Sequence, residues 1–190
     1  MQNENQKQNL RMTVYASLFA ALISAGAYLI IPIGPVPIVL QNLFVLLAGL
    51  LLGSRWGLAA VAIYLLAGAI GLPVFAGGAG GMGRIIGPTG GYLLSYLPAV
   101  FLVGSISERS RGKVLWDIFA MICGSLLVYA FGVSWLKFIS GMDWTGTAAV
   151  GMLPFLPGDL IKIAAAVPIV KTLRPIISGK FSAPQPETAG

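Results

Sequence analysis

The sequence predicts an all-α, polytopic membrane protein in which six transmembrane helices form one bundle and both termini face the cytoplasm. Its 190 residues are 57% hydrophobic and only 9% charged, and the mean hydropathy is +0.87. A soluble domain carries about 25% charged residues, so this composition indicates a chain whose surroundings are mostly lipid. The length fits one bundle rather than two domains, and the placement of the basic residues assigns its two sides.

Proline and glycine divide the uncharged stretches into helices. Residues 1–10 are polar, and we expect a frayed cytoplasmic segment there; the apolar run behind them is too long for a signal peptide and lacks a cleavage site. The bundle occupies residues 11–176, and a polar cytoplasmic tail covers 177–190. The predicted helices span residues 11–31, 37–53, 56–71, 90–106 and 115–138, and the sixth runs from after Pro157-Gly158 to near Arg174-Pro175.

The basic residues lie mostly on the side of the termini. Only Arg84 and Lys137 fall on the other side, and Lys162 is embedded in the sixth helix. The terminal side holds Lys7, Arg11, Arg55, Arg109, Arg111, Lys113, Lys171, Arg174 and Lys180. An excess of Lys and Arg marks the cytoplasmic side, so both termini are expected there. Topology therefore explains the net charge of +6, and no nucleic-acid partner is expected, because the charges are spread over four segments without a basic module.

Several kinds of chemistry are excluded by what the sequence lacks. There is no histidine, and Cys123 is the single cysteine. Histidine catalysis, histidine metal ligation and internal disulfides are therefore excluded, and we expect no metal, no cofactor and no enzymatic activity. Glycines at 78, 80 and 83 follow an apolar helix instead of a strand, so they do not form a nucleotide fingerprint. No Walker A motif is present, and any ATP used must be hydrolysed by a partner.

A glycine-rich stretch, Gly77 to Tyr92, reads GGAGGMGRIIGPTGGY, and eight of its sixteen residues are glycine. Irregular backbone at membrane depth is tolerated only where it is buried in protein or lines a cavity. The stretch is therefore interpreted as part of a binding chamber; a packed loop without a ligand is the alternative. The connection 31–37 and the segment 139–157 fall on the same external side, so three irregular segments converge on one site.

Asp159 and Lys162 lie within the last predicted span, three residues apart and hence on one helical face. Ionisable residues inside a membrane usually face the bundle interior or a cavity, which makes this pair a candidate binding site. In the alternative interpretation, Asp159 caps the helix and Lys162 pairs with it. The neighbours Gln41 and Asn42 add neutral donors and acceptors, but they point about 100° apart and both are not expected to face one site. Arg84 reaches either a ligand carboxylate or the lipid headgroups.

Small residues form rows on the first helix. Ala16 and Ala20 are four residues apart, with Ser24 next, and Ala21 and Ala25 make a parallel row. Such rows let helices approach closely within lipid. Internal packing and a docking face for another membrane protein are both compatible with this spacing.

Two segments resemble the BioY family, the biotin-specific S component of energy-coupling-factor vitamin transporters. The more specific is RIIGPTGGYLL, from Arg84 to Leu94, and the second is PGDLIK, from Pro157 to Lys162. The row at Ala16 and Ala20 is similar to the A-x-x-x-A motif with which S components meet their coupling subunit. The resemblance covers nearly the whole chain.

The resemblance implies a multi-pass protein of the bacterial plasma membrane that captures biotin on the external side. Its partners would be the lipid bilayer, a transmembrane coupling subunit that docks on Ala16 and Ala20, and two ATP-hydrolysing subunits. Asp159 would accept from a ureido N–H and Lys162 would make a polar or carboxylate contact. The remaining expected ligand-binding residues are Gln41, Asn42, Arg84, Gly87, Thr89 and Tyr92. Alternatives are an S component for another vitamin and a small membrane enzyme with Asp159 as base, although the chain lacks paired carboxylates.

Overall fold

The structure is a computed structural model that describes residues 2–31, 38–110 and 113–177. Residues 32–37 of the expected external connection, and 178–190 of the expected tail, lie outside the described residues. The other predicted segments can be compared with the structure one by one.

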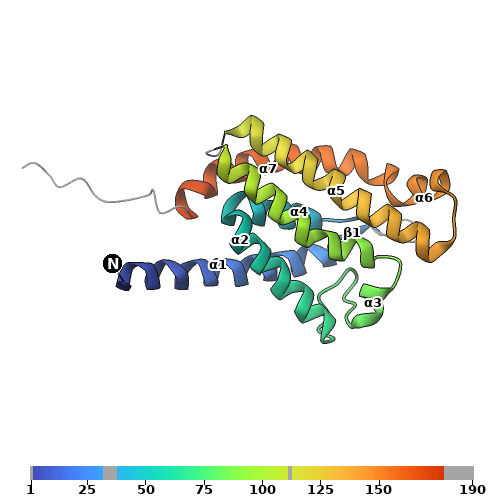
Figure 1. The fold of residues 1–190 in the computed structure, drawn as a ribbon, viewed down its shortest axis with the longest axis horizontal. Helices are drawn as coiled ribbons and strands as arrows, with labels where there is room; N and C mark the ends of the chain where they lie inside the picture. Colours follow the sequence, from blue (N-terminus) through green and yellow to red (C-terminus); the bar gives the residue numbers. More distant parts are fainter. Residues whose placement is uncertain (1, 32–37, 111–112, 178–190) are drawn as a thin grey trace, which may run out of the picture.

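The described residues form an elongated helical bundle with one very short hairpin (Figure 1). The strands β1 (Ile30–Ile31) and β2 (Ile38–Val39) pair antiparallel, with Ile30 opposite Val39. The helices are α1 (Gln2–Tyr28), α2 (Gln41–Ala69), α3 (Met82–Ile86), α4 (Gly90–Arg109), α5 (Val114–Ser140), α6 (Trp144–Gly151), the 3-10 turn η1 (Leu153–Phe155) and α7 (Leu156–Ile177). Within the described residues, five helical stretches are long and apolar enough to cross a membrane. The predicted all-α membrane fold is confirmed.

Helix α2 supplies the sixth pass because it is bent into two arms at Gly53. This residue has φ +80° and ψ −176°, a conformation that is closed to residues with a side chain. The arms run in opposite senses along the long axis (Figure 1) and approach closely, since a Cβ on Gly57 would lie 3.1 Å from the carbonyl oxygen of Ala48. The predicted second and third helices are therefore the two arms. Their short length reflects this bend inside one continuous segment.

Side chains from other helices satisfy the two backbone groups that the bend separates. In a straight helix the Ser54 N–H would donate to the Leu50 carbonyl. Instead, Ser54 N donates to Glu108 Oε1 at 2.8 Å, and Leu50 O accepts from Arg174 Nη2 at 3.1 Å. The charged ends of α4 and α7 thus fix the reversal of α2.

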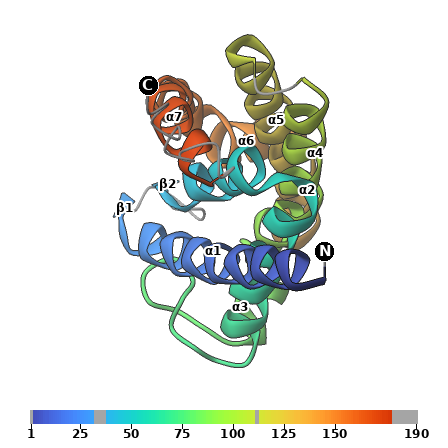
Figure 2. The same cartoon turned by 90° about the vertical axis from the view of Figure 1, so that its left-hand side faces the viewer.

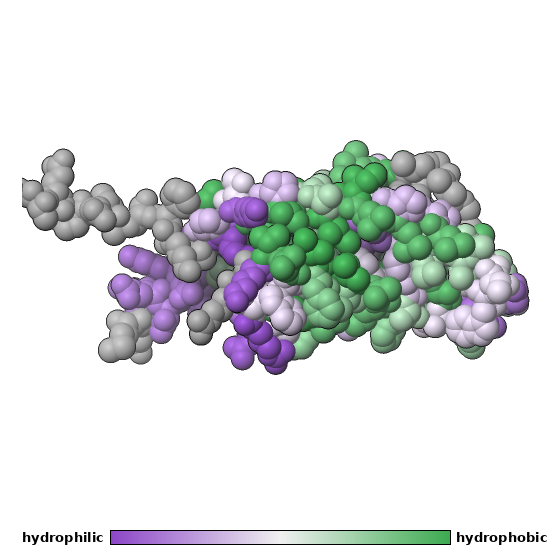
Figure 3. All heavy atoms as spheres, turned by 90° about the horizontal axis from the view of Figure 1, so that it is seen from above, coloured by the Kyte–Doolittle hydropathy of each residue, from purple (hydrophilic) through white to green (hydrophobic). Residues whose placement is uncertain are grey.

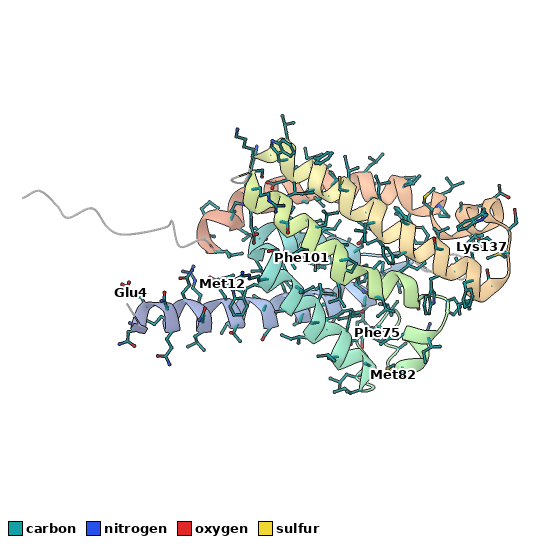
Figure 4. The ribbon with its side chains drawn as sticks, viewed as in Figure 1. Glu4, Met12, Phe75, Met82, Phe101 and Lys137 are labelled. Carbon is teal, nitrogen blue, oxygen red and sulfur yellow. The ribbon has the colours of Figure 1, made fainter. Side chains whose placement is uncertain are left out.

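Both ends of the described chain lie at the same end of the bundle, which we call the terminal end. Figure 2 looks onto it, with the start of α1 and the end of α7 toward the viewer. Arg11 on α1 donates to the carbonyl oxygen of Ile176 on α7, so the start of the first helix touches the end of the last. An even number of passes brings the two termini together, as predicted. The opposite end carries the hairpin, α3 and the α6–η1 segment, and Figure 4 shows Glu4 and Lys137 at these two extremes.

Several boundaries differ from the sequence prediction. Helix α1 begins at Gln2 and not near residue 11, because the polar segment 2–10 contains neither Gly nor Pro and is rich in good helix formers. It ends at Tyr28 rather than 31, since a residue before proline disfavours the helical conformation and Ile31 precedes Pro32. The segment 139–157, expected to be irregular, contains α6 and η1; Asp143 caps α6 by accepting from Gly146 N.

The predicted docking row on α1 is buried. Ala16 is 1% exposed and Ala20 is 5% exposed, and both belong to the core that α1 forms chiefly with α2. In the isolated chain these two alanines pack internally, and their role as a docking face stays a prediction. The parallel row, Ala21 and Ala25, lies on the exposed face of α1.

The surface has the distribution expected of a membrane protein. Figure 3 shows an apolar band across the middle of the bundle, with hydrophilic residues gathered toward the terminal end. Large apolar side chains such as Phe101, Leu126 and Phe131 are exposed on the membrane-spanning helices α4 and α5. In lipid such exposure has no hydrophobic cost, so the band is a bilayer-facing surface.

Candidate ligand-binding site

A small cavity lies toward the opposite end of the bundle, between α2, α4, α5 and α7. Its free volume is about 70 Å³. Seven of the eight residues predicted to bind ligand line it: Gln41, Asn42, Arg84, Thr89, Tyr92, Asp159 and Lys162. They come from segments far apart in the sequence, so the tertiary fold brings together what the sequence marked separately. Their role in binding stays a prediction.

Asp159 and Lys162 form a buried ion pair on the cavity wall. They are 6% and 9% exposed, and Lys162 Nζ lies 3.1 Å from Asp159 Oδ1. The other carboxylate oxygen accepts from the hydroxyl of Tyr129 on α5. Helix α7 begins at Leu156, so Asp159 lies within its first turn, and its side chain bonds to Lys162 and Tyr129 rather than capping the helix. The pair therefore faces the cavity as a neutral, strongly polar unit.

Gln41 and Asn42 both line the cavity, contrary to the expectation that only one would. They are the first two residues of α2, so the cavity meets the end of the helix and not its flank. Gln41 is 1% exposed and Asn42 is 9% exposed, and neither Gln41 Nε2 nor Asn42 Oδ1 has a hydrogen-bond partner among the described residues. A buried polar atom without a partner costs free energy, so these two atoms offer a donor and an acceptor to a ligand or to water.

Two predicted residues bond to backbone and support the site from its edge. Tyr92 Oη donates to Gly151 O at 2.7 Å, which ties α4 to the end of α6. Thr89 Oγ1 donates to Arg84 O at 3.3 Å, inside the loop that carries Arg84. Both residues still line the cavity. Their hydroxyl hydrogens, however, are directed to the protein.

Gly87 is the predicted residue that does not line the cavity. Its carbonyl oxygen accepts from Gly90 N and from the indole Nε1 of Trp135, both at 3.0 Å. Gly87 therefore belongs to the attachment of the loop to α5.

Sequence reasoning missed the aromatic lining. Phe75 comes from the loop between α2 and α3, and Phe155 comes from η1; we call these two the covering segments. Tyr96 and Tyr129 come from α4 and α5. Phe75 is fully buried and packs edge-on against Tyr64, with ring centroids 5.5 Å apart. Aromatic residues in an apolar helix give no sign of which face they occupy. The hydroxyl of Tyr129, in the middle of a span, was the available signal, because a buried phenol usually finds a partner.

A second, larger cavity of about 680 Å³ opens at the terminal end. It is lined by the bend of α2 and by Asp117, Glu108 and Arg174. These charged groups are already bonded to one another or to the backbone. The smaller cavity, where buried polar atoms lack partners, is therefore the better candidate for ligand binding.

The comparisons with known proteins agree on one family. The sequence matches the model of the BioY family over residues 1–179. It is 41% identical to the "Biotin transporter BioY" of Thermotoga maritima, covering 87% of this chain and 96% of that protein. It is 42% identical to the "Probable biotin transporter BioY" of Pyrococcus horikoshii, covering 83% and 93%. Among solved structures it resembles the crystal structure of an S-component for biotin from an ECF-type ABC transporter, with a TM-score of 0.83, 35% identity and coverage of 88% and 93%.

Proposed function

The chain belongs to the BioY family, and we propose that it is the S component of an energy-coupling-factor importer and captures biotin for ATP-driven uptake by partner subunits. The relatives are named transporters, and the structural neighbour is a biotin S component. A membrane enzyme with Asp159 as base has no observation in its favour, because that carboxylate is bonded to Lys162 and Tyr129.

The observation that carries this proposal is the arrangement of charge in the cavity. Biotin has a neutral ureido ring with N–H donors and a carbonyl acceptor, and a carboxylate at the end of its valerate chain. The Asp159–Lys162 pair presents an acceptor and a donor with no net charge, which suits the ureido ring. Arg84 lines the same cavity and suits the carboxylate. The aromatic side chains provide apolar surface for the sulfur-containing ring between these ends.

Binding in this cavity requires the covering segments to move outward. Its free volume of about 70 Å³ is well below the roughly 300 Å³ at the lower end of ligand pockets. Phe75 and Phe155 lie on segments that connect transmembrane helices, whereas Asp159 and Gln41 lie on the helices. We expect the connecting segments to open and close around biotin while the helical residues stay in place.

The proposed orientation places the terminal end in the cytoplasm. Arg55, Arg109, Lys113 and Arg174 lie near that end. Among the described cations, Arg84, Lys137 and the ion-paired Lys162 lie near the other. The positive-inside rule then places the biotin cavity on the external side.

Assembly with the energising module is part of the proposal, with the contact on the exposed face of α1. Ala21 and Ala25 are exposed on α1 whereas Ala16 and Ala20 are buried, so the exposed row is the contact that the experiment tests first. A tryptophan at Ala21 would block close helix approach from outside without entering the core.

The test is a calorimetric titration of the purified protein in detergent with biotin, followed by co-purification with the coupling and ATP-hydrolysing subunits. We expect saturable binding of one biotin per chain, retained in Ala21→Trp, and loss of co-purification in that variant. Folded protein that does not bind biotin would refute the biotin assignment. Competition titrations with other vitamins in the calorimeter distinguish a biotin S component from an S component for another vitamin.

A further inference from the structure

Arg84 carries the net charge of the biotin cavity. The other cation that lines it, Lys162, is neutralised by Asp159. Arg84 has no carboxylate within ion-pair distance in the described part of the chain. Its side chain is long and exposed, and it sits on the five-residue helix α3 inside a loop. How well it can bind a carboxylate therefore depends on how firmly the backbone of this loop is held.

The loop is attached to α5 at one point, through Trp135. The indole Nε1 donates to Gly87 O at 3.0 Å, three residues after Arg84. The same carbonyl oxygen accepts from Gly90 N, which joins the loop to the first turn of α4. Upstream, Gly81 N donates to Gly68 O of α2 at 2.7 Å. Helix α3 is thus held between α2 on one side and Trp135 on the other.

The glycines of the GPTGGY segment permit this attachment. A Cβ on Gly91 would lie 2.2 Å from Cβ of Trp135, and a Cβ on Gly90 would lie 1.7 Å from the carbonyl oxygen of Ile85. No side chain fits at either position, so the start of α4 packs directly against the α5 backbone and Trp135. The indole is consequently fixed against the loop, although tryptophans near helix ends commonly donate to lipid headgroups.

We propose that Trp135 is a positioning residue for ligand recognition: by holding Gly87 it fixes the loop that presents Arg84 and so sets the affinity for the carboxylate end of the ligand. This inference rests on the proposed binding of biotin. Trp135 does not line the cavity, so it acts through Arg84 rather than by contact. Its effect is therefore specific to ligands with a negative charge at that end.

The experiment compares biotin with biotin methyl ester, which is neutral at the valerate end, by calorimetric titration in detergent. Trp135→Phe keeps an aromatic ring against Gly91 and removes the N–H donor. Loss of one neutral hydrogen bond corresponds to about a 3- to 10-fold change in an equilibrium constant. We expect Trp135→Phe to weaken biotin by about this factor and the ester by less than about 2-fold. Arg84→Gln should show the same selectivity with a larger loss, and the double variant should bind no more weakly than Arg84→Gln alone.

Two further variants complete the design. Thr89→Val removes the hydroxyl bond to Arg84 O and should show the same selectivity as Trp135→Phe. Trp116→Phe changes a half-exposed tryptophan near the terminal end, so it should leave both affinities unchanged. A melting curve for each variant establishes that it is folded.

The outcomes separate the inference from the function on which it rests. Three results would overturn the role of Trp135 while biotin binding stands. In the first, Trp135→Phe weakens both ligands equally, and in the second, the losses in the double variant are additive. In the third, Trp135→Phe has no effect although Arg84→Gln selectively weakens biotin. An Arg84→Gln variant that fails to distinguish the two ligands would overturn it as well. A wild-type protein that binds neither ligand would refute the proposed function itself.

Discussion

Two buried aspartates, one at each end of the bundle, pair with a cation from α7 and differ in what else surrounds them. Asp117, at the terminal end, pairs with Arg174 through two contacts of 2.8 and 2.9 Å. Asp159, at the opposite end, pairs with Lys162 through one contact of 3.1 Å. Planar guanidinium matches a carboxylate with two parallel bonds, whereas an ammonium group acts as a point charge that can redirect its hydrogens.

The Asp117 pair is embedded in a network that supports the fold. Ser107 donates to Asp117 Oδ1 at 2.9 Å, and Arg174 Nη2 also reaches Ser107 and the carbonyl oxygen of Leu50. These bonds connect α2, α4, α5 and α7 where α2 reverses. Both oxygens of the Asp117 carboxylate accept hydrogen bonds within this network, which therefore supports the fold.

The Asp159 pair lies beside polar atoms that lack partners. Gln41 Nε2 and Asn42 Oδ1 line the same cavity and make no hydrogen bond with the described residues. Burial of these two atoms therefore carries a desolvation cost that a polar ligand can relieve. The contrast teaches that a buried charge in a membrane bundle indicates ligand binding when nearby polar atoms lack hydrogen-bond partners. It indicates a structural role when those atoms are bonded within the protein.

The largest expected effect is a loss of stability at the terminal end. Asp117→Asn removes the carboxylate that pairs with Arg174, and breaking a buried pair typically costs about 3 to 5 kcal/mol. Because Arg174 is partly exposed, we expect the lower end, about 3 kcal/mol, measured by unfolding in mixed detergent micelles. Biotin affinity of the folded fraction should be unchanged. A stable variant with weakened binding would break the comparison.

The same substitution at the other aspartate should affect mainly binding. Asp159→Asn removes a charged acceptor, so we expect the affinity for biotin to fall by about 1.5 to 3 kcal/mol, roughly 10- to 100-fold. The stability loss should be smaller than in Asp117→Asn, because Lys162 faces a cavity of about 70 Å³ that admits water. Titration and unfolding on the same preparation check both parts. Wild-type affinity would assign Asp159 to structure alone.

The smallest expected effect has opposite signs for binding and stability. Gln41→Met removes the amide of a 1% exposed side chain, whose Nε2 has no hydrogen-bond partner among the described residues, while keeping a similar shape. We expect the empty protein to be unchanged or stabilised by up to about 1 kcal/mol, and biotin to bind up to about 10-fold more weakly. Melting temperatures with and without biotin measure the two effects. Destabilisation of the empty protein would show that the amide is already bonded there, and Gln41 would then resemble Asp117.

Properties that depend on composition and local order were determined by the sequence alone. The low charge content and the long apolar runs define a membrane bundle, and the Pro and Gly residues mark where its helices end. Asp159 and Lys162 stood out because a charge inside an apolar span is costly wherever the span is placed. Residues 2–10 were misjudged because polar composition does not prevent a helix where Gly and Pro are absent. Residues 139–157 were misjudged because the Asp143 cap starts a helix despite the glycines that follow.

The tertiary structure decided which side of each helix faces inward. In a soluble protein the apolar face of a helix is the buried one, but here lipid and core are equally apolar, so the sequence gives no amphipathic signal that sets the rotation of a helix. For this reason the row of Ala16 and Ala20 could not be distinguished from that of Ala21 and Ala25, and the aromatic lining of the cavity was not visible. The partners of Trp135 and Arg174 lie 48 or more residues away in sequence, and such contacts exist only once the helices have packed.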